Sequence, residues 1–246
     1  MYIALSRDLS AIRGLIFQLA LVVAMFSPSL AVIAAPQDIT EVEMKLLPRY
    51  CPDTATFTPN PTREAYWRSV MGKGFSALHH YCWGQITMMR SRKAGLPAHI
   101  RQGMWESAVG DYLYVIRNSQ ADFVLLPEIY TRVGEVELLL AHTDKANNAF
   151  ARARQLKPDY WPAYSSWVEY LMNTGKRSEA LKFVVTGLQH SPEAKVLREQ
   201  FRLLGGKPSD LRQPFENQPT RNDPVTLIDP VMPGETPEPD ATLYDK

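Results

Sequence analysis

Two stretches of the chain match each other when the sequence is shifted against itself so that Tyr130 aligns with Tyr164. This shift is called the repeat offset below. It also aligns Gly134 with Val168, Ala146 with Ala180, Phe150 with Val184, Ala153 with Gly187, and Pro158 with Pro192. A fixed period of roughly 20–50 residues is typical of proteins built from stacked supersecondary units. The repeat offset therefore predicts a repeat architecture, in which each unit buries its apolar face against a neighbour.

Apolar side chains recur at three- and four-residue steps over most of residues 63–206, which predicts amphipathic helices. The first helix should begin near Arg63 with Thr62 as its N-cap, be divided at Gly72 and Gly74, and end before the Gly95-Leu96-Pro97 sequence. The later helices are expected at 100–118, 126–141, 144–156, 162–173 and 178–190, followed by a terminal helix through Leu203. Pro158, Gly175 and Pro192 supply the breaks between them.

The spacing of small and large residues resembles the tetratricopeptide repeat (TPR) family over residues 127–194, with units at 127–160 and 161–194. The repeat offset agrees with the unit length of that family, which is about 34 residues. A weaker match covers residues 77–124. The resemblance implies an all-α fold, a short right-handed α-solenoid of helix-turn-helix units spanning residues 63–206. Glu137, Val168 and Gly187 depart from the family pattern.

The same resemblance implies a place for a partner, because in this family the first helix of each unit lines a concave face. Carried onto this chain, that face comprises Glu128, Thr131, Glu135, Leu138, Tyr160, Ser165, Glu169, Met172 and Asn173. Its three carboxylates favour a basic or N–H-rich segment of a partner protein. The alternative is a solvated helix surface that carries ordinary charges.

The N-terminus has the order of a secretory signal peptide, expected at residues 1–34 with cleavage near Ala34. Arg7 and Arg13 precede an apolar run at residues 15–26, and small residues follow. An uncleaved anchor is the alternative, although this run is short for a bilayer of about 30 Å, which needs roughly 20 apolar residues. We therefore expect export to the periplasm of a diderm bacterium.

Export changes the expected state of the two cysteines, Cys51 and Cys82, because a pair in an oxidising compartment usually forms a disulfide. The alternative is a metal- or redox-active site in which Cys51, Cys82 and His79 bind Zn²⁺. The spacings Cys-x-x-Cys and His-x-x-x-His, which are typical of metal sites, do not occur. A disulfide without a bound metal is the preferred interpretation.

Two further clusters allow two interpretations each. An aromatic cluster either fills a core or anchors a partner; it comprises Tyr160, Trp161, Tyr164, Trp167 and Tyr170. Tyr160 and Trp161 are the pair expected to be exposed. The basic residues around the Gly95 turn complement a helix dipole or dock on an anionic surface; they are Arg90, Arg92, Lys93, His99 and Arg101.

Catalytic and nucleic-acid-binding signals are weak in this sequence. No Gly-x-Ser-x-Gly, phosphate loop or His-Glu-x-x-His motif, each typical of a class of enzymes, occurs. The formal net charge of +1 is too small to indicate a basic, nucleic-acid-binding domain. We expect a non-enzymatic periplasmic scaffold without a cofactor, serving envelope, secretion, pilus or polysaccharide assembly. Residues 35–62 should be irregular, and the proline-rich, acidic residues 207–246 should form a disordered tail.

Overall fold

The structure is a computed structural model that describes residues 36, 38–57 and 59–212. The contacts divide the chain into two units, and residues 33–222, which include all the described residues, form one of them. The other unit comprises residues 1–32 and 223–246, none of which is described. The predicted signal peptide at 1–34 and the predicted tail beyond residue 212 therefore lie outside the described residues.

The described part of the chain is helical and contains no β-strand, which confirms the predicted all-α class. Its elements are α2 (Glu41–Leu46), the 3₁₀ helix η1 (Cys51–Asp53), α3 (Pro61–Met71), the 3₁₀ helix η2 (Gly72–Ala77), α4 (Leu78–Ser91), α5 (Ala98–Arg117), α6 (Leu126–Leu139), α7 (Thr143–Leu156), α8 (Pro162–Asn173), α9 (Arg177–His190), α10 (Lys195–Leu203) and the 3₁₀ helix η3 (Asp210–Arg212). Because Gly72 ends α3 and opens η2, the predicted division of the first helix is confirmed.

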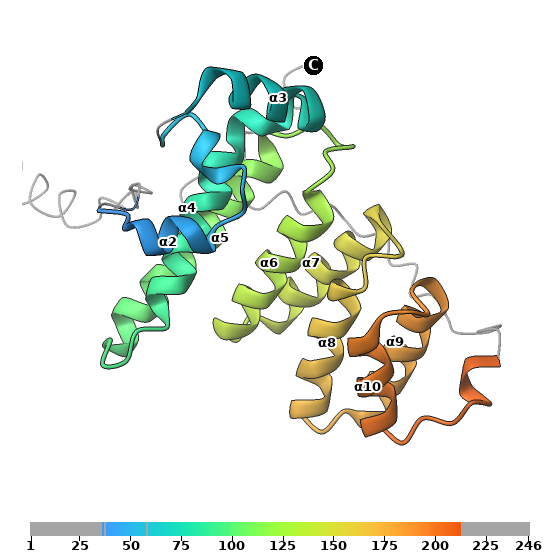
Figure 1. Cartoon of the computed structure of the whole chain (residues 1–246). Coiled ribbons are helices and arrows are strands. Elements are labelled where there is room, and N and C mark those ends of the chain that lie inside the picture. The colour runs from blue at the N-terminus through green and yellow to red at the C-terminus, as the bar shows by residue number, and fades with distance from the viewer. Residues whose placement is uncertain (1–35, 37, 58, 213–246) are drawn as a thin grey trace, which may run out of the picture. The chain divides into compact units, whose positions relative to one another are not determined.

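Helices that follow each other in the chain pack as pairs: α4 with α5, α6 with α7, and α8 with α9 (Figure 1). Each pair contacts the next one, because α6 packs on α5 and α8 packs on both α6 and α7. The short α10 covers α9 and α8 at the end of this series. The order of the helices in the chain is thus also the order of their contacts.

The repeat offset recurs in the helix boundaries and in the turns. It relates α7 to α9 at both ends, and it relates the C-terminal end of α6 to that of α8. The α6–α7 turn has Ala141 at φ 61°, and the α8–α9 turn has Gly175 at φ 77°. In both turns the next residue donates its N–H back to the preceding helix, from His142 to Glu137 O and from Lys176 to Leu171 O, at 2.8 Å in each case. This is the Schellman arrangement that ends many helices.

The aligned residues of the repeat lie between paired helices. Gly134 of α6 faces the ring of Phe150 on α7 so closely that an added Cβ would lie 2.8 Å from the ring. At the equivalent positions of the next pair, Val168 and Val184 are both fully buried. The space between the paired helices is therefore filled by a small and a large residue in one pair, Gly134 and Phe150, and by two residues of intermediate size in the next, Val168 and Val184.

The segment 35–62, predicted to be irregular, contains α2 and η1. Thr40 and Glu43 form a capping box at the start of α2. The N-cap of α3 is Asn60, whose side chain accepts from the N–H groups of Thr62 and Arg63, so the predicted cap at Thr62 is wrong. The sequence Asn60-Pro61 suits this role better, since Pro is favoured at the first helical position.

A disulfide joins Cys51 of η1 to Cys82 of α4, as predicted. Both residues are fully buried, and their Cα atoms lie 5.8 Å apart. Beside this disulfide the buried carboxylate of Asp53 accepts hydrogen bonds from Arg63 Nε at 2.9 Å and Trp67 Nε1 at 3.1 Å. These contacts hold η1 against both α3 and α4.

The described residues form two apolar clusters. The first extends from Leu47 to Val136 and includes Ala149 of α7, whereas the second includes Phe150 of α7 and extends to Leu197 of α10. In the aromatic cluster, Tyr164 and Trp167 are buried and Trp161 is 37% exposed, which agrees with the prediction that the repeat positions fill the core. Tyr160, predicted to be exposed, is half-buried.

The last described residues belong to the segment predicted to be a disordered tail. A turn after Lys207, in which the Asp210 side chain accepts from the N–H of Lys207, leads into η3. Helix η3 packs on α9. Among the described residues, no helix is both long enough and apolar enough to span a membrane.

Candidate partner-binding groove

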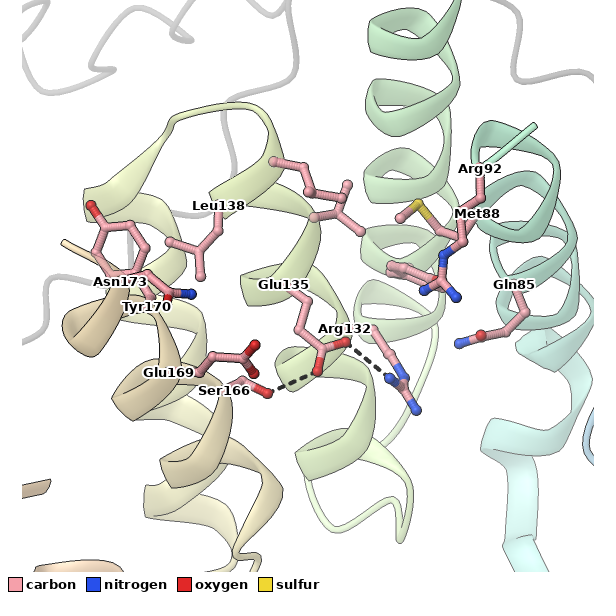
Figure 2. A pocket seen from close by; sticks show the side chains of 13 residues that line it. Gln85, Met88, Arg92, Arg132, Glu135, Leu138, Ser166, Glu169, Tyr170 and Asn173 are labelled. Carbon is pink, nitrogen blue, oxygen red and sulfur yellow. Dashed lines mark hydrogen bonds and ion pairs between the residues drawn. The ribbon is translucent and has the colours of Figure 1, made fainter. Parts of the chain in front are cut away.

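A groove of about 490 Å³ lies along α4, α6 and α8 (Figure 2). It is lined by Gln85 and Met88 of α4, Arg92 directly after α4, Tyr112 of α5, Arg132, Glu135, Val136, Leu138 and Leu139 of α6, and Ser166, Glu169, Tyr170 and Asn173 of α8. Helix α6 packs on α5 and α8, which places its side chains between the other two walls. This surface is called the groove below.

The lining positions of α6 and α8 are equivalent in the repeat. The repeat offset relates four pairs of lining residues: Arg132 and Ser166, Glu135 and Glu169, Val136 and Tyr170, and Leu139 and Asn173. Gln85, Met88 and Arg92 repeat the same spacing of three and then four residues along α4. Residues three and four apart share one helix face, so each of the three helices presents one face to the groove.

Arg132 is the centre of a polar network at the N-terminal end of the groove. Its Nη1 donates to Glu135 Oε2 at 2.9 Å, and Ser166 Oγ donates to Glu135 Oε1 at 2.9 Å, so this carboxylate connects α6 to α8. The Nη2 of Arg132 lies 3.9 Å from Glu128 Oε1, which accepts from the hydroxyl of Tyr81 at 2.6 Å. The network therefore links α4, α6 and α8 through side chains, and Figure 2 shows the part of it formed by Arg132, Glu135 and Ser166.

The network holds Arg132 in its charged form. Burial by itself disfavours this charge, but the nearby carboxylate of Glu135 outweighs burial, and the pKa of Arg132 is raised above its usual value. The pKa of the Tyr81 hydroxyl is also raised, first by burial and then by the charge of Glu128. Both groups therefore keep their protonated, hydrogen-bonding forms over the physiological pH range.

Two charged side chains of the groove have no such partners. Arg92 on the α4 wall and Glu169 on the α8 wall are exposed, and neither makes a side-chain hydrogen bond or ion pair within the described part of the chain. Figure 2 shows the two side chains on opposite sides of the groove. The apolar side chains of Met88, Val136 and Leu139 also line the groove.

The structure brings together four of the nine residues predicted to meet a partner: Glu135, Leu138, Glu169 and Asn173. Thr131 and Ser165 were also expected on this face, but both are buried. The Thr131 hydroxyl donates to Pro127 O at 2.8 Å, and the Ser165 carbonyl accepts from Gln200 Nε2 at 3.0 Å. Glu128, Tyr160 and Met172 are half-buried and do not line the groove.

The sequence interpretation missed several lining residues. They are Gln85, Met88, Arg92, Tyr112, Arg132, Val136, Leu139, Ser166 and Tyr170. Applied to the predicted residue Asn173, the repeat offset gives Leu139, but the offset relates positions without indicating which helix face they share, so it does not give Arg132 or Ser166. For α4 no equivalent signal exists, because its match to the repeat is weak.

The basic cluster around Gly95 has structural partners in part. Arg90 forms an ion pair with Glu43, its Nε lying 2.6 Å from Glu43 Oε1, and Arg101 Nε donates to the carbonyl of Ser91 at 3.1 Å. The Arg101 contact agrees with the interpretation that the cluster serves the end of α4, whereas Arg90 is paired with a carboxylate of α2. Arg92 alone of the cluster lines the groove.

The residues considered as zinc ligands have other partners. The sulfurs of Cys51 and Cys82 are bonded to each other, and His79 Nδ1 lies 3.0 Å from the carbonyl of Ser76. Among the described residues, no group of three or more His, Cys, Asp and Glu side chains is arranged to hold a metal ion. In comparisons with known proteins, no family profile, curated protein or solved structure matches this chain.

Proposed function

We propose that this chain is an exported, non-enzymatic scaffold whose TPR-like helical units form a short solenoid and bind a segment of a partner protein in the groove. It would act in the periplasm of a diderm bacterium, as part of envelope, secretion, pilus or polysaccharide assembly. No cofactor enters this proposal.

The observation that carries the proposal is the equivalence of the lining positions. The repeat offset relates Glu135 to Glu169 and Leu139 to Asn173, and all four residues line one groove. Stacked repeats that present equivalent positions to one side create an extended binding surface. The apolar side chains of the groove and its charged walls suit a polypeptide segment, which brings both apolar side chains and polar groups.

The structure also changes what the partner should look like. A basic segment was expected because three carboxylates, Glu128, Glu135 and Glu169, were assigned to one face. Arg132 lies between the first two and pairs with them, so only Glu169 is left without a charged partner in the described part of the chain. Charge alone therefore does not demand a basic partner.

Site-specific photo-crosslinking in intact cells tests the groove. Leu139 and Leu203 are both 49% exposed, but only Leu139 lines the groove. A photoreactive phenylalanine analogue at position 139 should crosslink to a segment of a periplasmic protein, and the same analogue at position 203 should not. The crosslinked peptide is then identified by mass spectrometry and synthesised.

The synthetic peptide makes the test decisive. It should bind the purified wild-type protein in fluorescence anisotropy and bind the Leu139→Asp variant at least tenfold more weakly, because a charge then stands among the apolar side chains. Equal crosslinking from positions 139 and 203, or equal affinity for both proteins, would contradict the proposal. Thermal melting of the variant checks that it remains folded.

Export is tested separately by the intact mass of protein isolated from the periplasm. The expected mass corresponds to residues 35–246, with two alkylatable thiols only after reduction. A mass that includes residues 1–34 would show a retained N-terminal segment instead.

A further inference from the structure

A second cavity lies at the C-terminal end of the described chain and shares no lining residue with the groove. Its volume is about 460 Å³, and its walls come from α9, α10, η3 and the turn between α9 and α10. It is lined by Leu188, Gln189, Pro192, Arg198, Phe201 and Leu211, and is called the terminal cleft below. Cavities of roughly 300–1,000 Å³ hold small ligands, so the terminal cleft has room for one aromatic side chain.

The walls of the terminal cleft are mostly apolar. Leu188 is a buried member of the second apolar cluster, and Phe201 is half-buried against that cluster. Leu211 of η3 is 40% exposed. An apolar side chain placed in the terminal cleft would remove this surface from water, which is favourable.

Arg198 makes an aromatic side chain the best occupant of the terminal cleft. Its Nε donates to Pro192 O at 2.6 Å, and its Nη2 lies 2.8 Å from Glu193 Oε1. These contacts orient the guanidinium, whose charge is attracted to the face of an aromatic ring within about 6 Å. An aliphatic side chain gains no such attraction, and a basic one is repelled.

The chain that continues from the terminal cleft carries an aromatic side chain. Leu211 lines the terminal cleft, and the described residues end at the next position, Arg212. The sequence then reads Gln213-Pro214-Phe215-Glu216. Phe215 is the only large apolar residue at positions 213–222, and the next one, Val225, is 14 positions beyond Leu211.

The tether between Leu211 and Phe215 is short enough to favour this residue over a separate protein. Phe215 is four positions after Leu211, a span of at most about 13–14 Å. Because Pro214 disfavours helical backbone at Gln213, we expect η3 to end there and the chain to leave it extended. The tether gives the ring a high effective concentration at the terminal cleft, whereas a separate protein loses translational and rotational entropy when it binds.

We propose that the chain after η3 runs across the terminal cleft and that the ring of Phe215 fills it, against Leu188, Phe201 and the guanidinium of Arg198. The terminal cleft is thus an internal docking site that completes the last helical unit, and it is not a second site for a partner. This inference does not depend on the binding of a partner in the groove.

Photo-crosslinking in the purified full chain tests the contact directly. A benzoylphenylalanine at position 215 keeps an aromatic side chain there and should crosslink to residues 188–201 of the same molecule. The same analogue at position 243 is the control, because Leu243 is also apolar but lies 28 positions further along the chain. It should not crosslink to residues 188–201. Mass spectrometry of the digested monomer identifies the joined peptides.

Substitutions measure how much the docked ring stabilises the protein. Phe215→Ala should lower the melting temperature by roughly 3–10 °C, the shift expected when a buried phenylalanine is lost from a domain of this size. Leu243→Ala should leave it unchanged. In a Leu211→Ser background Phe215→Ala should have little further effect, because one wall is already lost. In a Leu203→Ser background it should keep its full effect, since Leu203 is similarly exposed but lies outside the terminal cleft.

Four outcomes would overturn the proposal. They are a crosslink from position 215 to a second copy of the chain, a crosslink from position 215 only to residues outside the terminal cleft, a crosslink from position 243 to residues 188–201, and equal effects of Phe215→Ala in the two serine backgrounds. None of them bears on the groove, where partner binding is measured separately with Leu139→Asp.

Discussion

Ala141 occupies a backbone conformation that L-residues rarely adopt. Its φ is 61°, and the equivalent residue of the next turn is Gly175, with φ 77°. The left-handed conformation costs about 1–2 kcal/mol for a residue with a Cβ, whereas glycine adopts it freely. The same turn is therefore made once with strain and once without it.

Exchanging these two residues tests the strain. Ala141→Gly should raise the free energy of unfolding by about 0.5–1 kcal/mol, because the relief of strain exceeds the entropy that glycine adds to the unfolded chain. Gly175→Ala should lower it by a similar amount. Urea unfolding gives both values, and a destabilised Ala141→Gly variant would show that the methyl group of Ala141 is worth more than the strain.

Glu43 gives the protein a pH-dependent contribution to stability. Hydrogen bonds from Arg90 first, and then from Thr40, lower its pKa from 4.5 to about 2. A lowered pKa in the folded state means that the unfolded chain binds the proton more tightly. The contribution of Glu43 is therefore fully present above pH 4.5 and is lost as the pH falls towards 2.

We expect Glu43→Gln to lower the melting temperature at pH 7, and we expect the difference from the wild type to shrink between pH 4.5 and 2. Calorimetry at several pH values measures it. Glu41→Gln is the control on the same helix, because its side chain is 92% exposed and its ion pair with Lys45 spans 3.9 Å. A difference that stays constant down to pH 2 would show that the carboxylate charge of Glu43 does not contribute.

At the scale of the elements, the disulfide connects a short N-terminal segment to the first helix pair. Cys51 and Cys82 are 31 residues apart in the chain, and the loop between them contains α3 and η2. In the chain-entropy model, closing a loop of this length stabilises the fold by about 3–4 kcal/mol. Without the disulfide, η1 would still be held by Asp53, which bonds Arg63 and Trp67 of α3.

The double variant Cys51→Ala/Cys82→Ala should lose about 3–4 kcal/mol in free energy of unfolding. Reduction of the wild type should produce a similar loss, and reduction of the variant should change nothing. Denaturant unfolding with and without a reductant measures both. A loss below about 1 kcal/mol would indicate that the denatured chain is already restricted in this region.

Helix boundaries could be predicted from the sequence because local residues determine them. Helix α8 begins at Pro162 and ends at Asn173, as expected, since Pro162 and Gly175 determine the two ends. The cap of α3 was misplaced by two residues, because Asn60 and Thr62 are both good caps and only the Pro61 between them decides.

The face of each helix was harder to predict than its ends. Successive residues of a helix are rotated by about 100°, so Ser165 is buried while Ser166 faces the groove. Burial of Ser165 depends on α10, whose Gln200 bonds its carbonyl from 35 residues away. The prediction took the partner face of α8 from the resemblance to the TPR family, and a contact between residues this far apart leaves no local pattern that would have corrected it.

For the whole described unit, stability should be distributed along the series of helices. The two apolar clusters meet at α7, where Ala149 belongs to one and Phe150 to the other. Each helix pair packs on the pair that follows it, and in proteins whose units pack mainly on their neighbours stability is approximately a sum over units and their interfaces. A local defect should therefore spread only to the adjacent helices.

Leu197 allows a test of this distribution. It is fully buried between α10 and its neighbours, and Leu197→Ala should cost about 2–5 kcal/mol in the second cluster. Hydrogen exchange should accelerate in α8, α9 and α10 and remain nearly unchanged in α4 and α5. Equal acceleration in all helices would show that the unit unfolds in a single cooperative step.

The equivalent turns between α6 and α7 and between α8 and α9 have a consequence for how such a chain can change in length. Thr143 follows the α6–α7 turn in the same way as Arg177 follows the α8–α9 turn, and the repeat offset relates the two residues. A duplication of residues 143–176 would therefore join its copies at a junction that already exists in the protein. An in-frame duplication would add one unit and one more set of lining positions. The groove would then lengthen in evolution while the new unit used the same kinds of contact that already join the existing units.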